Sequence, residues 1–77
     1  MDKTSIINTK VFDMAYSRGF NGEYVSDDDR LNEDLYLDSL DQVELIMSIE
    51  TALGYTPDYK QLYNVNTVKD VYELFSV

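Results

Sequence analysis

Apolar residues recur at helical spacing in the first part of the chain. Four of them are separated by one, three or four residues, so they fall on one face of a helix: Ile7, Val11, Met14 and Ala15. Gly19 follows the last of them. Glycine readily takes the left-handed conformation that ends many helices, so we expect this helix to end just before Gly19.

The stretch from Phe20 to Leu37 keeps neither a helical nor a strand period. It contains the turn dipeptide Asn21-Gly22 and three consecutive aspartates. We expect a long loop, and a loop of this length in a small domain is usually either functional or disordered. The apolar residues expected to pin it to the core are Phe20, Tyr24, Val25, Leu31 and Leu35.

The strongest helical pattern covers residues 39–53. Ser39 and Gln42 fit the S/T-x-x-E/Q capping box, and Asp38 is an alternative N-cap. Gly54 follows as a stop signal, and Pro57 prevents the helix from resuming. The residues expected to form the inward stripe are Leu45, Ile46, Ile49, Ala52 and Leu53.

Two shorter helical segments follow. A helical turn is expected over residues 58–63, and Asn66 or Thr67 can cap a last helix. The expected buried face of that helix consists of Val68, Val71, Tyr72 and Phe75. Three main helices and one short helix, with a long loop between the first and second, predict an all-α small four-helix bundle in a single domain over residues 1–77.

The long helix also carries a second apolar set off its main stripe. This set consists of Leu40, Val43 and Met47, and the acidic residues interleaved with it are Asp41, Glu44 and Glu50. One interpretation is a helix with a wide apolar side inside a small bundle. The other is an exposed apolar strip framed by carboxylates, which would suit a partner with a mixed hydrophobic and basic surface.

Composition excludes several kinds of chemistry. The 77 residues include 15 acidic and 6 basic side chains, a formal charge of −9, and no Cys or His. Disulfides, thiolate catalysis and Ser-His-Asp catalysis are therefore beyond this chain alone, and zinc would lack its usual nitrogen and sulfur ligands. Residues 21–50 hold ten carboxylates against Arg30 alone, which argues against nucleic acid and anionic membranes as partners. No apolar run approaches the roughly 20 residues of a membrane span. We expect a cytoplasmic monomer without stable membrane association.

The middle of the chain resembles the acyl carrier protein family, in its free-standing, phosphopantetheine-binding form. Three steps carry the resemblance: Glu33-Asp34-Leu35, Asp38-Ser39-Leu40 and Val43-Glu44-Leu45. The order and lengths of the expected helices also match the family over almost the whole chain. One departure is Tyr36-Leu37, where the family commonly has a glycine shortly before Asp-Ser-Leu.

The resemblance implies that 4′-phosphopantetheine from coenzyme A is attached to the Ser39 hydroxyl, flanked by Asp38 and Leu40, and that its thiol holds acyl groups as thioesters. It implies a carrier that serves as a cosubstrate, with no catalytic residues and no specific metal site. The implied partners are a phosphopantetheinyl transferase and acyl-transfer and synthesis enzymes with basic docking surfaces. The implied docking residues are Asp38, Leu40, Asp41, Val43, Glu44, Met47 and Glu50, and the implied acyl-chain cavity is lined by Leu45, Ile46 and Ile49.

Three other functions fit the residues less well. The run Asp27-Asp28-Asp29 suggests a calcium loop, but an EF-hand starting there would need Gly at its sixth position, where Asn32 stands. An unmodified acidic interaction module is compatible with the charge but leaves the context of Ser39 unexplained. An enzyme would need a nucleophile–base pair that we do not find. Among carriers, fatty-acid synthesis is the first expectation, and polyketide, lipid-modification or aminoacyl pathways are the alternative.

Overall fold

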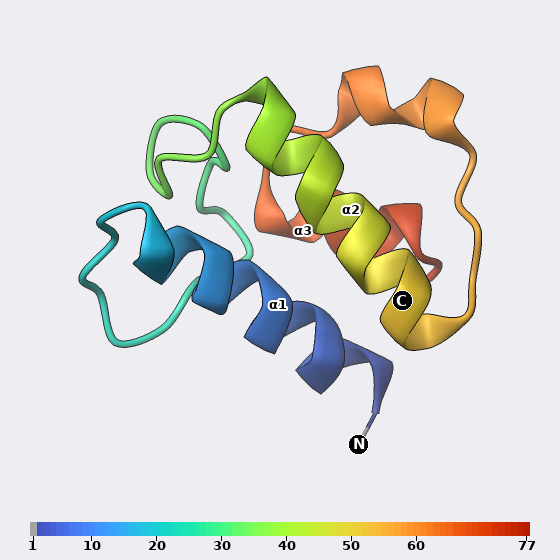
Figure 1. Ribbon diagram of the computed structural model, residues 1–77, viewed down its shortest axis with the longest axis horizontal. Helices are drawn as coiled ribbons and strands as arrows, with labels where there is room; N and C mark the ends of the chain where they lie inside the picture. The colour runs from blue at the N-terminus through green and yellow to red at the C-terminus, as the bar shows by residue number, and fades with distance from the viewer. Residues whose placement is uncertain (1) are drawn as a thin grey trace.

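The computed structural model describes residues 2–77, so Met1 of the expected domain lies outside the described part. Its helices are α1 (Lys3–Ser17), α2 (Ser39–Leu53), the 3₁₀ helix η1 (Tyr59–Asn64) and α3 (Val68–Leu74). Figure 1 shows α1 and α2 side by side, with α3 behind α2 and η1 at the far end of the link that follows α2. The predicted all-α fold is confirmed over residues 2–77, where the only strand-like pairing is an isolated bridge.

Short polar side chains begin these helices. Asp2 accepts a hydrogen bond from the Ser5 N–H at 2.7 Å, and Asp58 accepts one from the Lys60 N–H at 3.0 Å. Thr67 forms a capping box with Asp70 at the start of α3. Such caps satisfy N–H groups that have no partner inside the helix. Of the two caps considered from the sequence, Thr67 is therefore the one used.

Glycines end the two long helices, as predicted. Gly19 follows α1 with a φ of 107°, and the next residue, Phe20, donates its N–H to the Ala15 carbonyl at 3.0 Å. Gly54 follows α2 with a φ of 66° and donates to the Glu50 carbonyl. Both backbones lie in the left-handed region, which glycine enters without a Cβ clash.

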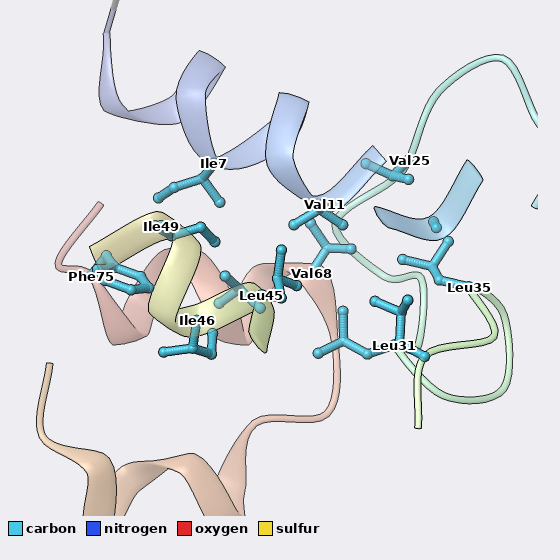
Figure 2. Close-up of a cluster of buried hydrophobic side chains, with 13 residues drawn as sticks. Ile7, Val11, Val25, Leu31, Leu35, Leu45, Ile46, Ile49, Val68 and Phe75 are labelled. Atoms are coloured by element: carbon cyan, nitrogen blue, oxygen red, sulfur yellow. The ribbon is translucent and has the colours of Figure 1, made fainter. Parts of the chain in front are cut away.

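The hydrophobic core lies between the three α-helices and the long loop (Figure 2). Each α-helix turns apolar side chains toward it, and the loop closes one end. The contributions of the helices are Ile7, Val11 and Ala15 from α1, Leu45, Ile46 and Ile49 from α2, and Val68, Val71 and Phe75 from the α3 region, while Val25, Leu31, Leu35 and Leu37 come from the loop. Burial of these side chains is the main force that assembles the bundle.

The long loop is tied to the start of α3 by backbone hydrogen bonds. Arg30 and Thr67 form an isolated antiparallel bridge. Beside it, the Leu31 N–H donates to the Asn66 carbonyl at 2.9 Å, and the Val68 N–H donates to the Asp29 carbonyl at 3.0 Å. These bonds satisfy backbone groups that would otherwise be buried without partners. These bonds fix the position of the loop that precedes α2 in the sequence.

Several buried positions differ from the sequence predictions. Tyr24 is 72% exposed rather than buried, because its neighbour Val25 takes the inward position. Ala52 is exposed, since the fully buried stripe of α2 ends at Ile49. Leu37 is fully buried although it was not among the predicted anchors.

Candidate functional site

The start of α2 is built around Asp38, which is its N-cap. The Asp38 Oδ1 accepts the Asp41 N–H at 2.8 Å, and the Asp41 Oδ2 accepts the Asp38 N–H at 3.2 Å. The capping box expected between Ser39 and Gln42 is therefore wrong, and the alternative cap Asp38 is correct. The side-chain amide of Gln42 (Nε2) instead donates to the Leu37 carbonyl at 3.0 Å. As a result, the hydroxyl of Ser39 lies outside the cap, on an exposed first residue of α2.

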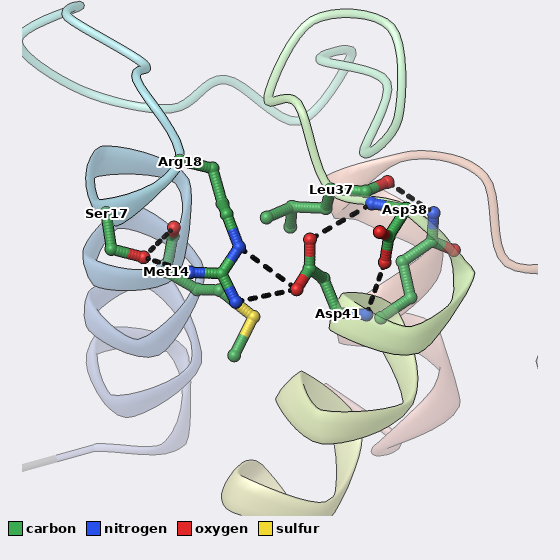
Figure 3. A network of polar contacts seen from close by, with 7 residues as sticks. Met14, Ser17, Arg18, Leu37, Asp38 and Asp41 are labelled. Atoms are coloured by element: carbon green, nitrogen blue, oxygen red, sulfur yellow. Dashed lines mark hydrogen bonds and ion pairs between the residues drawn. The ribbon is translucent and has the colours of Figure 1, made fainter.

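An ion pair holds this helix start against the end of α1 (Figure 3). Arg18 donates from Nη2 at 2.7 Å and from Nε at 3.0 Å to the Asp41 Oδ1. The hydrogen bonds from Arg18 hold the pKa of Asp41 below its usual range, and the same contact raises the pKa of Arg18. Asp41 is only 7% exposed. The structure thus places Asp41 in an internal pair and not on the exposed docking face expected from the sequence.

The segment before the cap is a tight turn that ends in a left-handed residue. Tyr36 has a φ of 64°, and its N–H donates to the Asn32 carbonyl at 3.1 Å. The Leu37 N–H donates to the Leu31 carbonyl at 2.9 Å, while the Asn32 side-chain amide donates back to the Leu37 carbonyl at 3.1 Å. This explains why the departure at Tyr36 matters, because the turn requires a conformation that glycine adopts most easily. The turn delivers the chain to Asp38 and Ser39 in one fixed direction.

A groove of about 510 Å³ lies beside Ser39, between α2 and η1. Its walls are Ser39, Gln42, Val43, Tyr59, Leu62, Tyr63 and Val65. This groove was not predicted from the sequence, although the apolar residues of the helical turn expected over residues 58–63 were a usable signal. The residues expected to line an acyl cavity, Leu45, Ile46 and Ile49, are not in this groove. They are closed into the core at 1% exposure or less.

The outer face of α2 presents the second apolar set to solvent. Leu40 is 68%, Val43 37% and Met47 53% exposed, and we call these three residues the docking strip. Asp38 and Glu44 are exposed on the same helix. Glu50 is partly buried and accepts a hydrogen bond from the Tyr59 hydroxyl at 2.9 Å, which raises the pKa of Tyr59. The open question about this set is therefore settled in favour of exposure.

Comparison with known proteins agrees with this arrangement. The family model described as "Phosphopantetheine attachment site" matches residues 19–75. The acyl carrier protein of Saccharopolyspora erythraea is 35% identical over 74 residues, which cover 96% of this chain and 78% of that protein. This chain belongs to the acyl carrier protein family.

Two further acyl carrier proteins support the assignment. That of Rickettsia canadensis is 36% identical over 72 residues, covering 92% of this chain and 84% of its own length. That of Coprothermobacter proteolyticus is 40% identical over 52 residues, covering 68% of this chain and 63% of its own length. The chain is thus an acyl carrier protein that carries phosphopantetheine. Members of this family are carriers and not catalysts, and they interact with phosphopantetheinyl transferases and synthesis enzymes. None of the helices within residues 2–77 has the length and apolar character to cross a membrane.

The residues at the start of α2 fit such a group. Ser39 offers an exposed hydroxyl that no cap occupies, and the groove beside it gives an attached arm an apolar wall to lie on. The first N–H groups of α2, those of Ser39 and Leu40, are at the positive end of the helix dipole and favour a nearby phosphate. The carboxylate of Asp38 opposes that phosphate electrostatically.

Proposed function

We propose that this carrier bears 4′-phosphopantetheine on Ser39 and delivers acyl intermediates to fatty-acid synthesis enzymes in the cytoplasm. One observation carries the choice of residue. Ser39 is the first residue of α2, it is exposed, and its hydroxyl is left outside the capping box because Asp38 takes that role. The family match supports the chemistry, and this geometry supports Ser39 as the acceptor.

Each residue at the helix start has a separate task in this proposal. Ser39 provides the Oγ that bonds to the phosphate of the arm, while the pyrophosphate bond of coenzyme A breaks and adenosine 3′,5′-bisphosphate leaves. Asp38 keeps its Oδ1 in the cap, and we propose that the transferase supplies the base that removes the Ser39 proton. When bound, the group supplies a terminal thiol that holds acyl chains as thioesters. The chain has no Cys, so it has no thiol of its own to compete for the cargo.

Partner enzymes are proposed to dock on the docking strip and the carboxylates beside it. Leu40 and Met47 offer apolar contact, while Asp38 and Glu44 offer charge to basic residues of the partner. Contacts of this kind assemble quickly and weaken with salt. A monomeric carrier that acts as a cosubstrate has to dissociate from each enzyme after each step, which requires such modest affinity. Asp41 contributes indirectly, by holding the helix start through Arg18.

An acyl chain that entered the helix bundle would have to separate the side chains of the hydrophobic core. Leu45, Ile46 and Ile49 remain the residues proposed to line that space, since they form the inner face of α2. In the present structure they are packed against the other helices, so the cavity requires α2 to move away from its neighbours. The surface groove needs no such opening.

A second candidate pathway is favoured by the lining of that groove. Tyr59 and Tyr63 stand on its η1 side. Tyrosine combines an apolar ring with a hydroxyl that seeks a polar partner. The Tyr59 hydroxyl already donates to Glu50, so the hydroxyl that could bond an oxygen-bearing cargo, as in polyketide synthesis, is that of Tyr63.

The test of the proposed function is intact mass after incubation with coenzyme A and a broad-specificity phosphopantetheinyl transferase. The wild type should gain one phosphopantetheinyl group, Ser39→Ala should gain none, and the matched control Ser26→Ala should gain one. A folded wild type that gains nothing with several transferases would overturn the proposal. Elongation of the loaded carrier by purified fatty-acid enzymes then decides the pathway, and failure there with success in a polyketide system would favour the second candidate.

A further inference from the structure

Tyr36 holds a backbone conformation that disfavours its own side chain. Its φ of 64° lies in the left-handed region, where the Cβ of a non-glycine residue crowds the backbone. The conformation is imposed by the turn. The Tyr36 N–H bonds to the Asn32 carbonyl, and the flanking Leu37 is fixed both by its N–H and by its carbonyl. Glycine or asparagine would fit this position with less strain.

The ring of Tyr36 does little for the fold in return. Leu35 and Leu37 on either side are fully buried, whereas Tyr36 is 55% exposed. The ring also lies outside the apolar residues that pack against the core. A bulky residue kept at a strained position without a packing role points to a use outside the fold.

The surroundings of Tyr36 indicate what the ring meets. Tyr36 precedes Ser39 by three residues, which limits the distance between their Cα atoms to about 11 Å. Residues 31–44 contain five carboxylates and no Lys or Arg. Asp41 is buried against Arg18, and Glu33 and Asp34 pair with Arg30, so Asp38 and Glu44 are the exposed carboxylates that form no salt bridge within the described residues. An enzyme that reaches Ser39 therefore meets these two carboxylates with an exposed aromatic ring beside them. The side chain best attracted by both is a cation, because carboxylates attract its charge and an aromatic face attracts it through the ring quadrupole.

We infer that Tyr36 is a specificity-determining residue, whose ring face receives an arginine or lysine side chain of the enzymes that act at Ser39. This inference rests on the proposed function of Ser39. Arginine is the better fit, since its planar guanidinium stacks on aromatic faces. Enzymes that place a cation at this position are accepted, and enzymes that place an apolar or acidic group there are disfavoured.

Four variants separate the ring from the backbone strain. Tyr36→Phe keeps both, and Tyr36→Leu keeps the strain without the ring. Tyr36→Asn and Tyr36→Gly remove both. The measurements are the melting temperature and the KM and kcat for loading of the full-length carrier by a basic, broad-specificity transferase with coenzyme A. Tyr24→Leu, at an exposed tyrosine elsewhere in the loop, is the matched control.

The expected effects on stability and on loading are opposite. Tyr36→Asn and Tyr36→Gly should raise the melting temperature by about 2–6 °C, yet raise KM by about three- to tenfold. Tyr36→Leu should raise KM equally with little change in melting temperature, and Tyr36→Phe and Tyr24→Leu should resemble the wild type.

An unchanged KM in Tyr36→Leu and Tyr36→Gly would overturn the inference, while Ser39 is still loaded in the wild type. A Tyr36→Phe variant as impaired as Tyr36→Leu would also overturn it, because the hydroxyl and not the ring face would then make the contact. Failure of the wild type to be loaded at Ser39 would instead overturn the proposed function on which the inference rests.

Discussion

Arg18 and Asp41 connect the end of α1 to the start of α2 across 23 residues of sequence, with the Nη2 of Arg18 2.7 Å from the Oδ1 of Asp41. The second oxygen of Asp41 accepts the N–H of the helix cap Asp38. One carboxylate therefore serves both the ion pair and the cap. The pair fixes how the first turn of α2, and with it Ser39, lies against α1, and it removes one carboxylate from the exposed surface.

Replacing Asp41 by Asn should lower the melting temperature at neutral pH by removing the charge that faces Arg18. The pKa of Asp41 is lowered from 3.8 in the folded protein by its bonds with Arg18. The unfolded chain then takes up this proton first as the pH falls. The contribution of the ion pair to the free energy of unfolding is complete above pH 3.8, and it is lost as the pH falls through the lowered pKa of Asp41 in the folded protein. The difference in melting temperature between wild type and Asp41→Asn should therefore be constant from about pH 7 to 5 and shrink below about pH 4.

Glu44→Gln is the matched control for this experiment, because Glu44 is an exposed carboxylate on the same helix. It should leave the melting temperature nearly unchanged across the same range. A difference for Asp41→Asn that persists undiminished to pH 3 would contradict the role given to the ion pair.

Glu44→Lys should weaken docking to a basic carrier-dependent enzyme, since it reverses an exposed charge beside the docking strip. We expect a loss of about tenfold in affinity at low ionic strength and a smaller loss at physiological salt, where screening is stronger. Titration of the loaded carrier against the enzyme at two salt concentrations measures it. Glu73→Lys makes the same change on α3 and should have little effect. Equal affinity of Glu44→Lys and wild type at low salt would rule out the docking surface.

The sequence was sufficient to predict the helices because their signals are local. The bounds of α2 follow from its apolar period, from Gly54 as a stop, and from a choice of caps that included Asp38. Exposure of Leu40 and Met47 required the structure, since the pattern alone was equally compatible with a wide buried face. Local sequence patterns predict where the helices lie, and only the packing shows which of two apolar helix faces is buried.

Other features depend on residues far apart in sequence. The bridge between Arg30 and Thr67, and the pairing of Arg18 with Asp41, join segments that have no shared local pattern. Asp41 was therefore placed among the exposed acids. Tyr36 is a different case, because the missing glycine is visible in the sequence, whereas the left-handed backbone that makes it matter is visible only in the structure.

Two residues on α2 should separate stability from docking. Ile49 is fully buried, and Ile49→Ala should reduce the free energy of unfolding by about 2–5 kcal/mol. Met47 is 53% exposed, and Met47→Ala should change that free energy by less than about 0.5 kcal/mol while weakening partner docking. Urea unfolding and the docking titration give the two readings. Ile49→Val, which keeps most of the side chain, should lose only about 0.5–1.5 kcal/mol. A Met47→Ala variant that is unfolded, or that docks as the wild type does, would contradict this division of the helix.

The assignment of the cap to Asp38 makes a prediction that distinguishes it from Ser39. Asp38→Ala should lower the free energy of unfolding by about 1 kcal/mol, because the Asp41 N–H loses its acceptor. Ser39→Ala should be nearly neutral, since the Ser39 hydroxyl lies outside the capping box. Asp38→Asn keeps a capping oxygen and should restore most of the stability.

The same three variants divide differently in the loading assay. Ser39→Ala should not be loaded at all, because it lacks the acceptor oxygen. Asp38→Ala and Asp38→Asn should both be loaded with a raised KM, since each removes the charge offered to a basic transferase next to Ser39. Asp38→Asn is the decisive variant, because it combines a near-normal melting temperature with impaired loading. If Ser39→Ala proved as unstable as Asp38→Ala, the serine would be the cap after all, and its hydroxyl would be less available to the transferase than the structure indicates.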